Sequence, residues 1–230
     1  MNLPRIATLF FAMLLLVAGA PALAQYQEGV HFERIDRPDA ASAGDEIEVV
    51  EVFSYMCPHC RNFQPYVAAW EADLGEDVEF RRVPVVFNRS WEPFARAYYT
   101  ASVLDMLGDS HEALFAALHD ERRPIRTLSD LADFHAQFGI DADKFESTAK
   151  SFPVESRLRM GNANLGKWGV RSTPTLIIDN TWRVSPRRGG TFDEMLAVAD
   201  WLLDRARAER GPAEDDTAEP ESSEDPAAGS

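Results

Sequence analysis

The segment that most restricts the fold is the seven-residue run Ile47-Glu48-Val49-Val50-Glu51-Val52-Phe53. It is short, rich in β-branched residues and apolar on both faces, which is typical of a central strand covered on both sides. Helices are therefore expected to flank the sheet. The apolar residues after this strand recur at intervals of four, three and four, as Phe63, Val67, Trp70 and Leu74. This spacing predicts a helix from about Pro58 to Leu74.

A long helical region is expected in the middle of the chain. The next strand is predicted at Val78–Val83, which completes a β-α-β unit. Between about Trp91 and Trp168 the strand signals vanish and helical periods repeat, interrupted by Gly and Pro. This region is therefore predicted to be an inserted helical bundle.

The chain returns to the sheet after this region. Thr175–Ile178 has strand composition, and Trp182–Val184 is expected to pair with it across a turn at Asp179-Asn180. The last helix is predicted to begin at Thr191, whose hydroxyl caps the helix while Glu194 reaches back to the cap.

The two ends of the chain differ from its middle. Residues 1–24 contain an apolar run from Ile6 to about Ala18 and an Ala-x-Ala pattern that ends at Ala24. The run is shorter than a membrane span of about 20 residues, so a secretory signal peptide cleaved near Ala24 is predicted, with an uncleaved anchor as the alternative. From Gly211 onward acids mix with small residues, and residues 208–230 are expected to form a disordered acidic tail.

Composition argues against one class of partner. The 230 residues carry a formal net charge of −15, whereas binding to nucleic acid needs clustered Lys and Arg. Exported proteins often contain structural disulfides, yet this sequence has only two cysteines. Its core must therefore hold together without a covalent link.

The two cysteines form the motif Cys57-Pro58-His59-Cys60 at the predicted junction between strand and helix. Pro58 suits the first helical position, which needs no backbone donor. Cys57 then lies at the cap, where unpaired amides and the helix dipole favour a thiolate, and His59 adds to this stabilisation when it is protonated or donating. A stabilised thiolate favours the reduced protein, so the disulfide form is predicted to oxidise other thiols strongly.

Two other interpretations of the motif remain open. A structural disulfide is the first, although a four-residue ring constrains the chain little. The second is a metal site formed by Cys57, His59 and Cys60, which would make the protein a metal or peptide carrier. Zinc normally takes four protein ligands, or three with an open position, and the remaining histidines have no matching spacing. Redox catalysis is the favoured interpretation.

Glu51 supports the redox interpretation. It shares a strand face with Val49 and Phe53, where an ionised carboxylate is costly unless it is paired. Because this strand leads to the dithiol, Glu51 is a candidate to relay a proton to or from Cys60. An ordinary salt bridge with Arg82 on the neighbouring strand is the alternative, and the two roles are compatible.

Three segments together resemble the DsbA family of thioredoxin-like periplasmic disulfide oxidases. Glu51 to Cys60 is similar to that family's strand and active-site segment, and the helical region is similar to its helical domain. Gly169-Val170-Arg171-Ser172-Thr173-Pro174-Thr175 is similar to the loop that presents a cis-proline beside the dithiol. The resemblance covers about residues 26–207.

The resemblance implies a fold and a domain division. The expected fold is α/β and thioredoxin-like, with an inserted α-helical domain. Residues 25–90 and 169–207 would form a discontinuous thioredoxin-like domain, and residues 91–168 would form the insertion.

The resemblance also implies roles for individual residues. Cys57 would be the exposed nucleophile that forms a mixed disulfide, and Cys60 would be its buried partner. Pro174 would be cis, while Thr173 would offer backbone groups to an extended substrate peptide. From sequence alone, a trans proline at the start of a strand is the alternative.

The predicted function is therefore a thiol:disulfide oxidoreductase that donates disulfide bonds to reduced or unfolded exported polypeptides in the periplasm. No bound cofactor or metal is expected, and the protein is expected to be a monomer. As the resemblance implies, a DsbB-type membrane quinone-linked oxidase would restore the disulfide. A disulfide isomerase or reductase of the same fold is the nearest alternative. Gln64 and Arg82 replace an acid and a lysine that are frequent in the family, so proton relay can be tuned differently here.

Overall fold

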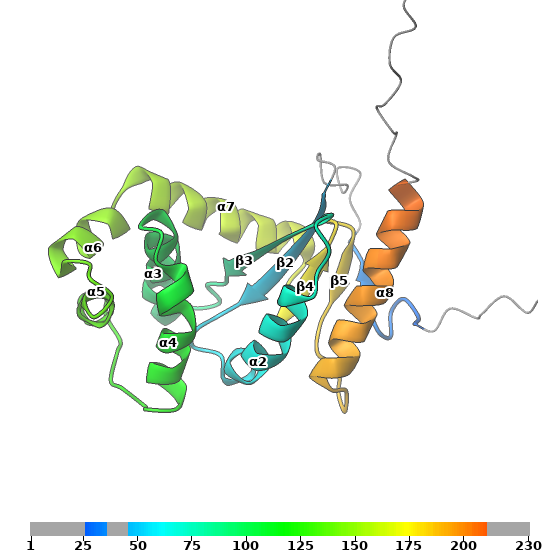
Figure 1. Cartoon of the computed structure of the whole chain (residues 1–230), viewed down its shortest axis with the longest axis horizontal. Coiled ribbons are helices and arrows are strands. Elements are labelled where there is room, and N and C mark those ends of the chain that lie inside the picture. The colour runs from blue at the N-terminus through cyan, green and yellow to red at the C-terminus, as the bar shows by residue number, and fades with distance from the viewer. Residues whose placement is uncertain (1–25, 36–45, 211–230) are drawn as a thin grey trace, which may run out of the picture.

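The computed structural model describes residues 26–35 and 46–210 of the chain (Figure 1). The predicted signal peptide at residues 1–24 lies outside the described residues, and so does the predicted acidic tail from residue 211 onward. Within the described ranges, no helix is both long enough and apolar enough to cross a membrane.

A five-stranded mixed sheet forms the middle of the molecule, with strand order β1-β5-β4-β2-β3 (Figure 1). β2 pairs in parallel with β3 and antiparallel with β4, so it lies inside the sheet as predicted. Every β2 residue except Glu48 is buried, because helices cover both faces of this strand. The strands are β1 Glu33–Arg34, β2 Ile47–Phe53, β3 Val78–Pro84, β4 Thr175–Ile178 and β5 Trp182–Val184.

Helices occupy the regions that the periodicity predicted. The first ends at Ala72 rather than at the expected Leu74, and a short 3₁₀ helix, η2, precedes the helical region. The elements are α2 Pro58–Ala72, η2 Arg89–Trp91, α3 Glu92–Val103, α4 Leu107–His119, α5 Leu128–Ala136, α6 Ala142–Ala149, α7 Phe152–Trp168 and α8 Phe192–Arg210.

The two faces of the sheet are covered by different helices. α2 and α8 lie on one face and α7 lies on the other (Figure 1). Val49 of β2 belongs to the same hydrophobic cluster as Phe63 of α2 and Leu202 of α8. Val50, the next residue, instead packs in a cluster with Leu165 and Trp168 of α7. The alternation along β2 therefore directs Ile47 and Val49 into one core, and Val50 and Val52 into the other.

A third hydrophobic cluster fills the helical region and continues to the end of β2. Leu114 and Phe115 of α4 are fully buried in it. Phe53, Cys57 and Cys60 belong to the same cluster. The segment that bears the dithiol is therefore packed directly against the helical region.

The return to the sheet also follows the prediction. β4 and β5 pair antiparallel, and the turn residues Asp179 and Asn180 have φ values of 50° and 51°. Left-handed φ at both positions is the requirement of a tight hairpin turn whose twist matches the strands.

The predicted start of the acidic tail at residue 208 is wrong. Residues 208–210, which the sequence places in the tail, instead form the end of α8. Their helical state is supported by the Arg205–Glu209 pair, four residues apart, and by a 2.5 Å contact between Arg210 and Asp179.

The cap of α8 supports a stability prediction. The Glu194 amide donates to Thr191 Oγ1 at 3.1 Å, and the Thr191 amide donates to Glu194 Oε2 at 3.0 Å. Thr191→Ala should therefore lower the free energy of unfolding by about 1 kcal/mol, because one amide loses its partner. The urea unfolding midpoint measures this change. Thr191→Ser keeps the hydroxyl and should remain close to the parent protein; an equal loss in both variants would show that the cap is not the cause.

Candidate active site

The dithiol lies at the junction between β2 and α2. Cys57 is the N-cap residue of α2 with extended backbone, at φ −96° and ψ 115°, and Pro58 is the first helical residue. Both placements agree with the prediction. Cys60 lies one turn into the helix, and both cysteines are free thiols in this structure. The structure therefore represents the dithiol form of the protein.

Cys57 is less exposed than the family resemblance implied. Its exposed fraction is 7%, against 0% for Cys60. The cause is the loop at Thr173, whose carbonyl oxygen lies 3.5 Å from the Cys57 sulfur and accepts a hydrogen bond from the thiol. Because Cys60 has no exposed surface, Cys57 is the sulfur of the pair that an incoming reactant can reach.

The Cys57 sulfur is stabilised as a thiolate. Its pKa is lowered from 9.0 to about 5, first by a hydrogen bond from the Cys60 thiol and then by one from the Thr173 side chain. The backbone amides of His59 and Cys60 contribute further, while burial opposes the shift. These amides are the unpaired donors expected at a helix N-terminus. His59 thus acts on this sulfur through its amide, and its imidazole is on the exposed surface.

Cys60 has the opposite tendency. Burial raises the pKa of its thiol far above the ordinary 9.0, and the neighbouring Cys57 raises it further. The two sulfurs therefore differ strongly: one favours the charged form and the other the protonated form. This difference is what a disulfide-exchange site needs, because one sulfur remains reactive while the other holds a proton.

The loop opposite the dithiol is held in place by side-chain hydroxyls. The Thr173–Pro174 peptide bond is cis, as the resemblance implied. Thr175 Oγ1 donates to the Ser172 carbonyl at 2.9 Å and lies 2.8 Å from Ser185 Oγ. The Thr173 carbonyl oxygen of this loop lies 3.5 Å from the Cys57 sulfur.

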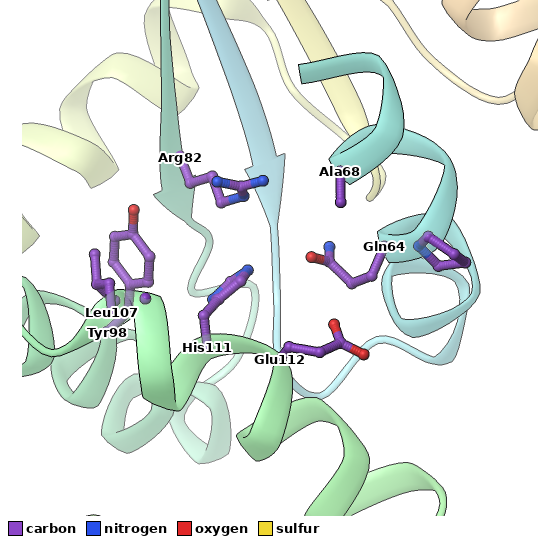
Figure 2. A pocket seen from close by; sticks show the side chains of 9 residues that line it. Gln64, Ala68, Arg82, Tyr98, Leu107, His111 and Glu112 are labelled. Carbon is purple, nitrogen blue, oxygen red and sulfur yellow. The ribbon is translucent and has the colours of Figure 1, made fainter. Parts of the chain in front are cut away.

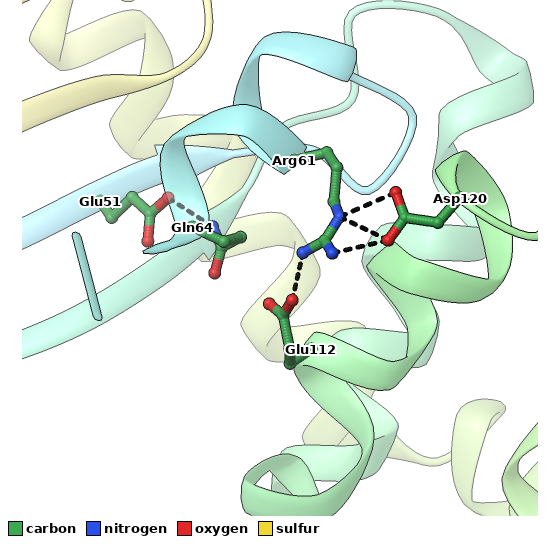
Figure 3. Close-up of polar contacts among 5 residues, drawn as sticks. All are labelled: Glu51, Arg61, Gln64, Glu112 and Asp120. Carbon is green, nitrogen blue, oxygen red and sulfur yellow. Dashed lines mark hydrogen bonds and ion pairs between the residues drawn. The ribbon is translucent and has the colours of Figure 1, made fainter. Parts of the chain in front are cut away.

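Glu51 is buried beside the dithiol and is paired. It has no exposed surface, and the predicted salt bridge is present, with Arg82 Nε donating to Glu51 Oε2 at 2.9 Å. Gln64 Nε2 donates to the other carboxylate oxygen at 3.2 Å (Figure 3). Arg82 also pairs with Glu71 of α2. Desolvation dominates over these partners and raises the pKa of Glu51 from 4.5 to about 7.

The helical region contributes contacts that no sequence pattern indicated. His119 Nε2 lies 2.7 Å from the Tyr55 carbonyl oxygen and donates to it, and the Tyr55 hydroxyl lies 2.8 Å from His111 Nδ1. Arg61, next to Cys60, pairs with Glu112 and with Asp120 of the segment around α4 (Figure 3). These partners are separated by more than fifty residues in sequence, so local spacing carries no signal for them.

The metal-site interpretation finds no geometric support. Across residues 26–35 and 46–210, no group of three or more His, Cys, Asp or Glu side chains is arranged to hold a metal ion.

The thiolate can be tested through its main donor. Cys60→Ala removes the hydrogen bond to Cys57, so the pKa of Cys57 should rise from about 5 toward its ordinary 9.0. Cys60→Ser keeps a hydroxyl donor and should retain most of the lowering. The pH dependence of alkylation at Cys57 measures both values. If the two variants titrate alike, the helix amides rather than Cys60 stabilise the thiolate.

Glu51 should make the dithiol form less stable as the pH rises. Its pKa is higher in the folded chain than its ordinary value, so the folded state binds the proton more tightly than the unfolded state. The stabilisation is complete below pH 4.5 and is lost as the pH passes about 7. The full difference corresponds to about 3 kcal/mol.

Glu51→Gln should remove this decline from the free energy of unfolding of the reduced protein, measured in urea between about pH 4.5 and pH 8.5. Glu79→Gln, at an exposed position of β3, is the control. A decline that persists in Glu51→Gln would contradict the assignment.

Comparison with known proteins gives a consistent result. A profile of the DSBA-like thioredoxin domain matches residues 76–193. The thiol:disulfide interchange protein DsbA of Pseudomonas aeruginosa is 32% identical over 203 residues, which is 88% of this chain and 96% of that protein. The DsbA of Azotobacter vinelandii is 33% identical over 71% of this chain and 76% of that protein.

Solved structures show the same relationship. The crystal structure of the oxidoreductase DsbA from Xylella fastidiosa superimposes with a TM-score of 0.74 at 37% identity, covering 80% of this chain and 98% of that one. The crystal structure of Pseudomonas aeruginosa DsbA gives a TM-score of 0.75 at 32% identity, covering 80% and 96%. With its dithiol at a helix N-terminus and its cis-proline loop alongside, the chain belongs to the DsbA family and is a thiol:disulfide oxidoreductase of thioredoxin-like α/β fold.

Proposed function

We propose that this chain donates disulfide bonds to reduced polypeptides exported to the periplasm, using a Cys57–Cys60 disulfide as the oxidant. The observation that supports this direction is the pKa of Cys57, lowered to about 5. At neutral pH the reduced protein holds a stabilised thiolate, and this stabilisation is absent from the disulfide form. Stabilising the reduced form makes the disulfide a stronger oxidant.

The reaction begins at the accessible sulfur. A substrate thiolate attacks Cys57 Sγ, the bond between Cys57 and Cys60 breaks, and a mixed disulfide forms between substrate and Cys57. The electron pair of the broken bond goes to Cys60, which leaves as a thiolate. Because burial strongly disfavours that charge, Cys60 must take up a proton.

Glu51 is the proposed source of this proton. Its pKa of about 7 means that it exchanges a proton near neutral pH, and its charge contributes to the raised pKa of Cys60. A second substrate thiolate then attacks the substrate sulfur of the mixed disulfide, and Cys57 leaves as its stabilised thiolate. The substrate has lost two electrons and the enzyme has gained them.

Substrate binding is assigned to the loop beside Cys57. Thr173 is within hydrogen-bonding distance of the Cys57 sulfur, and Pro174 keeps the loop close to it. An extended peptide that pairs with the backbone of Thr173 would bring its own thiolate to the reactive sulfur. Pro58 fixes the start of α2 on the opposite side.

The cellular setting completes the proposal. Residues 1–24 act as a signal peptide that is cleaved near Ala24, and the mature protein works as a monomer in the periplasm. Two electrons pass from the reduced dithiol to a DsbB-type membrane quinone-linked oxidase, which restores the disulfide. Residues 25–90 and 169–207 form the thioredoxin-like domain, and residues 91–168 form the inserted helical domain. The array of helices between Trp91 and Trp168 supports this division.

Trapping the intermediate tests the assigned nucleophile. Cys60→Ser should accumulate mixed disulfides with exported polypeptides, because Cys57 can form the bond while no second cysteine resolves it. Cys57→Ser should accumulate none, and non-reducing gels of the exported fraction would show the difference. Equal adducts in both variants, or none in either, would contradict the role of Cys57.

The direction of transfer is measured separately, as the equilibrium of the mature dithiol with a glutathione buffer. An oxidising potential supports donation of disulfides. A strongly reducing potential would instead assign the protein to the reductases or isomerases of the same fold.

A further inference from the structure

Three chain segments meet at the dithiol, and their charged residues are all arginines. The first segment, residues 54–60, carries the dithiol and has no Asp, Glu, Lys or Arg. The second, residues 169–175, contains the cis-proline and has Arg171 as its one charged residue. The third, residues 185–191, has Arg187 and Arg188. The whole chain has 38 acidic residues against 23 Lys and Arg, so these segments differ in sign from the rest of the sequence.

The third segment borders the dithiol on two sides. The turn between β5 and α8 lies at the same end of the sheet as the start of α2 (Figure 1). Ser185, directly after β5, has its Oγ 2.8 Å from Thr175 Oγ1 of the cis-proline segment. At the start of α8, the Phe192 ring lies 5.1 Å from the Phe63 ring of α2. The turn therefore lies between the cis-proline loop and the helix that carries the dithiol.

Arg187 is already engaged within this turn. Its Nη2 donates to Glu194 Oε1 at 2.9 Å, and the other oxygen of that carboxylate accepts from the Thr191 amide at 3.0 Å. The Arg187–Glu194 pair fixes the turn to the first turn of α8. Because the two charges oppose each other, this pair leaves little net charge for a reactant.

Arg171 and Arg188 keep their positive charge available. Both are exposed, and neither forms an ion pair within residues 26–35 and 46–210. Arg171 lies two residues before Thr173, whose carbonyl oxygen is 3.5 Å from the Cys57 sulfur. Each guanidinium offers five donors in a planar fork that matches a carboxylate. The loops beside Cys57 therefore present two unpaired sites for an acidic side chain.

The helical side of the dithiol has the opposite charge. Arg61, next to Cys60, pairs with both Glu112 and Asp120. Two carboxylates share one guanidinium there, so this side carries an excess of negative charge. An acidic segment of a reactant is consequently repelled on the α4 side and attracted on the side of the two loops.

We propose that Arg171 and Arg188 make the site selective for reduced polypeptides that carry an Asp or Glu close to the reacting cysteine. This preference rests on the proposed function, because it concerns which reduced polypeptides receive the disulfide fastest. An extended peptide that pairs with Thr173 places the residue two positions from its cysteine about 7 Å along the same face. Arg171 is displaced from Thr173 by the same two residues, so a carboxylate at that position of the peptide lies within its reach.

The selectivity acts on the rate of encounter. Exposed charges at the rim of a binding site change the association rate and its salt dependence more than they change affinity. The formal net charge of the chain is −15, so attraction by the whole protein would favour basic peptides. The two loops favour acidic ones. The order of reactivity among peptides of different charge therefore distinguishes local recognition from the overall field.

Three synthetic peptides test this order. Each contains two cysteines, and they differ only in having Asp, Asn or Lys two positions from the first cysteine. The measurement is the single-turnover rate constant for peptide oxidation by the disulfide form of the mature protein. Each rate constant is divided by that for bis(2-hydroxyethyl) disulfide, an uncharged oxidant, which corrects for the effect of the neighbouring charge on the peptide thiol itself.

The normalised rate constants should follow the order Asp, Asn, Lys, with about a 5-fold advantage of the Asp peptide over the Lys peptide at about 0.01 M ionic strength. At about 1 M the advantage should almost vanish, because the screening length falls from about 30 Å to about 3 Å.

Substitution of both arginines locates the source of the preference. The double variant Arg171→Gln with Arg188→Gln should lose the advantage of the Asp peptide and should oxidise the Asn peptide as the parent protein does. Arg171→Lys with Arg188→Lys keeps both charges and should retain most of the preference. The matched control is Arg159→Gln with Lys144→Gln, which removes two exposed charges from the helical region and should leave the preference unchanged.

The outcomes separate the two proposals. Equal normalised rates for the three peptides, or a fastest reaction with the Lys peptide, would overturn the selectivity while the proposed function stands. A preference that survives in the double Gln variant, or that disappears equally in the matched control, would also overturn it. If the parent protein oxidises none of the peptides, the proposed function falls and the selectivity falls with it.

Discussion

The hydrogen bond from the Cys60 thiol to the Cys57 sulfur is the interaction on which the chemistry of this site depends. It is the largest contribution to the lowered pKa of Cys57. It exists because α2 begins between the two cysteines, so Cys57 caps the helix while Cys60 lies one turn inside it. The same geometry turns the helix amides toward Cys57 and buries Cys60 in the core. One helix start therefore produces both a thiolate and a protonated thiol.

The pKa of Glu51 depends on two opposing effects, its burial and the Arg82 guanidinium. Burial alone would keep the Glu51 carboxyl protonated, and the guanidinium alone would keep it ionised. Their opposition leaves its pKa at about 7. The pKa of Cys57 is below its ordinary value, whereas the pKa of Glu51 is above its own. Raising the pH therefore stabilises the folded dithiol form through the Cys57 thiolate and destabilises it through the Glu51 carboxylate. A site that must hold both charges near neutral pH is thus a compromise between reactivity and stability.

Local patterns predicted the elements that local forces determine. The two-faced apolar run of β2, the proline at the start of α2 and the Thr191 cap are all confirmed. The prediction that Cys57 is exposed was wrong, because its burial depends on Thr173, which lies 116 residues away along the chain. A cavity of about 330 Å³ beside Gln64 and Arg82 (Figure 2) was equally invisible, since residues of four separate elements line it. Sequence periodicity reports which face of an element is apolar, but it does not report which distant segment will cover that face.

The helical region is part of the site rather than an appendage to it. α4 contacts the active-site segment through His111 and His119, which engage the hydroxyl and the carbonyl of Tyr55. Arg61, the residue after Cys60, forms ion pairs with Glu112 and Asp120 in the same part of the helical region. The hydrophobic cluster of that region also contains both cysteines. Any movement of α4 relative to α2 must therefore alter the environment of the dithiol.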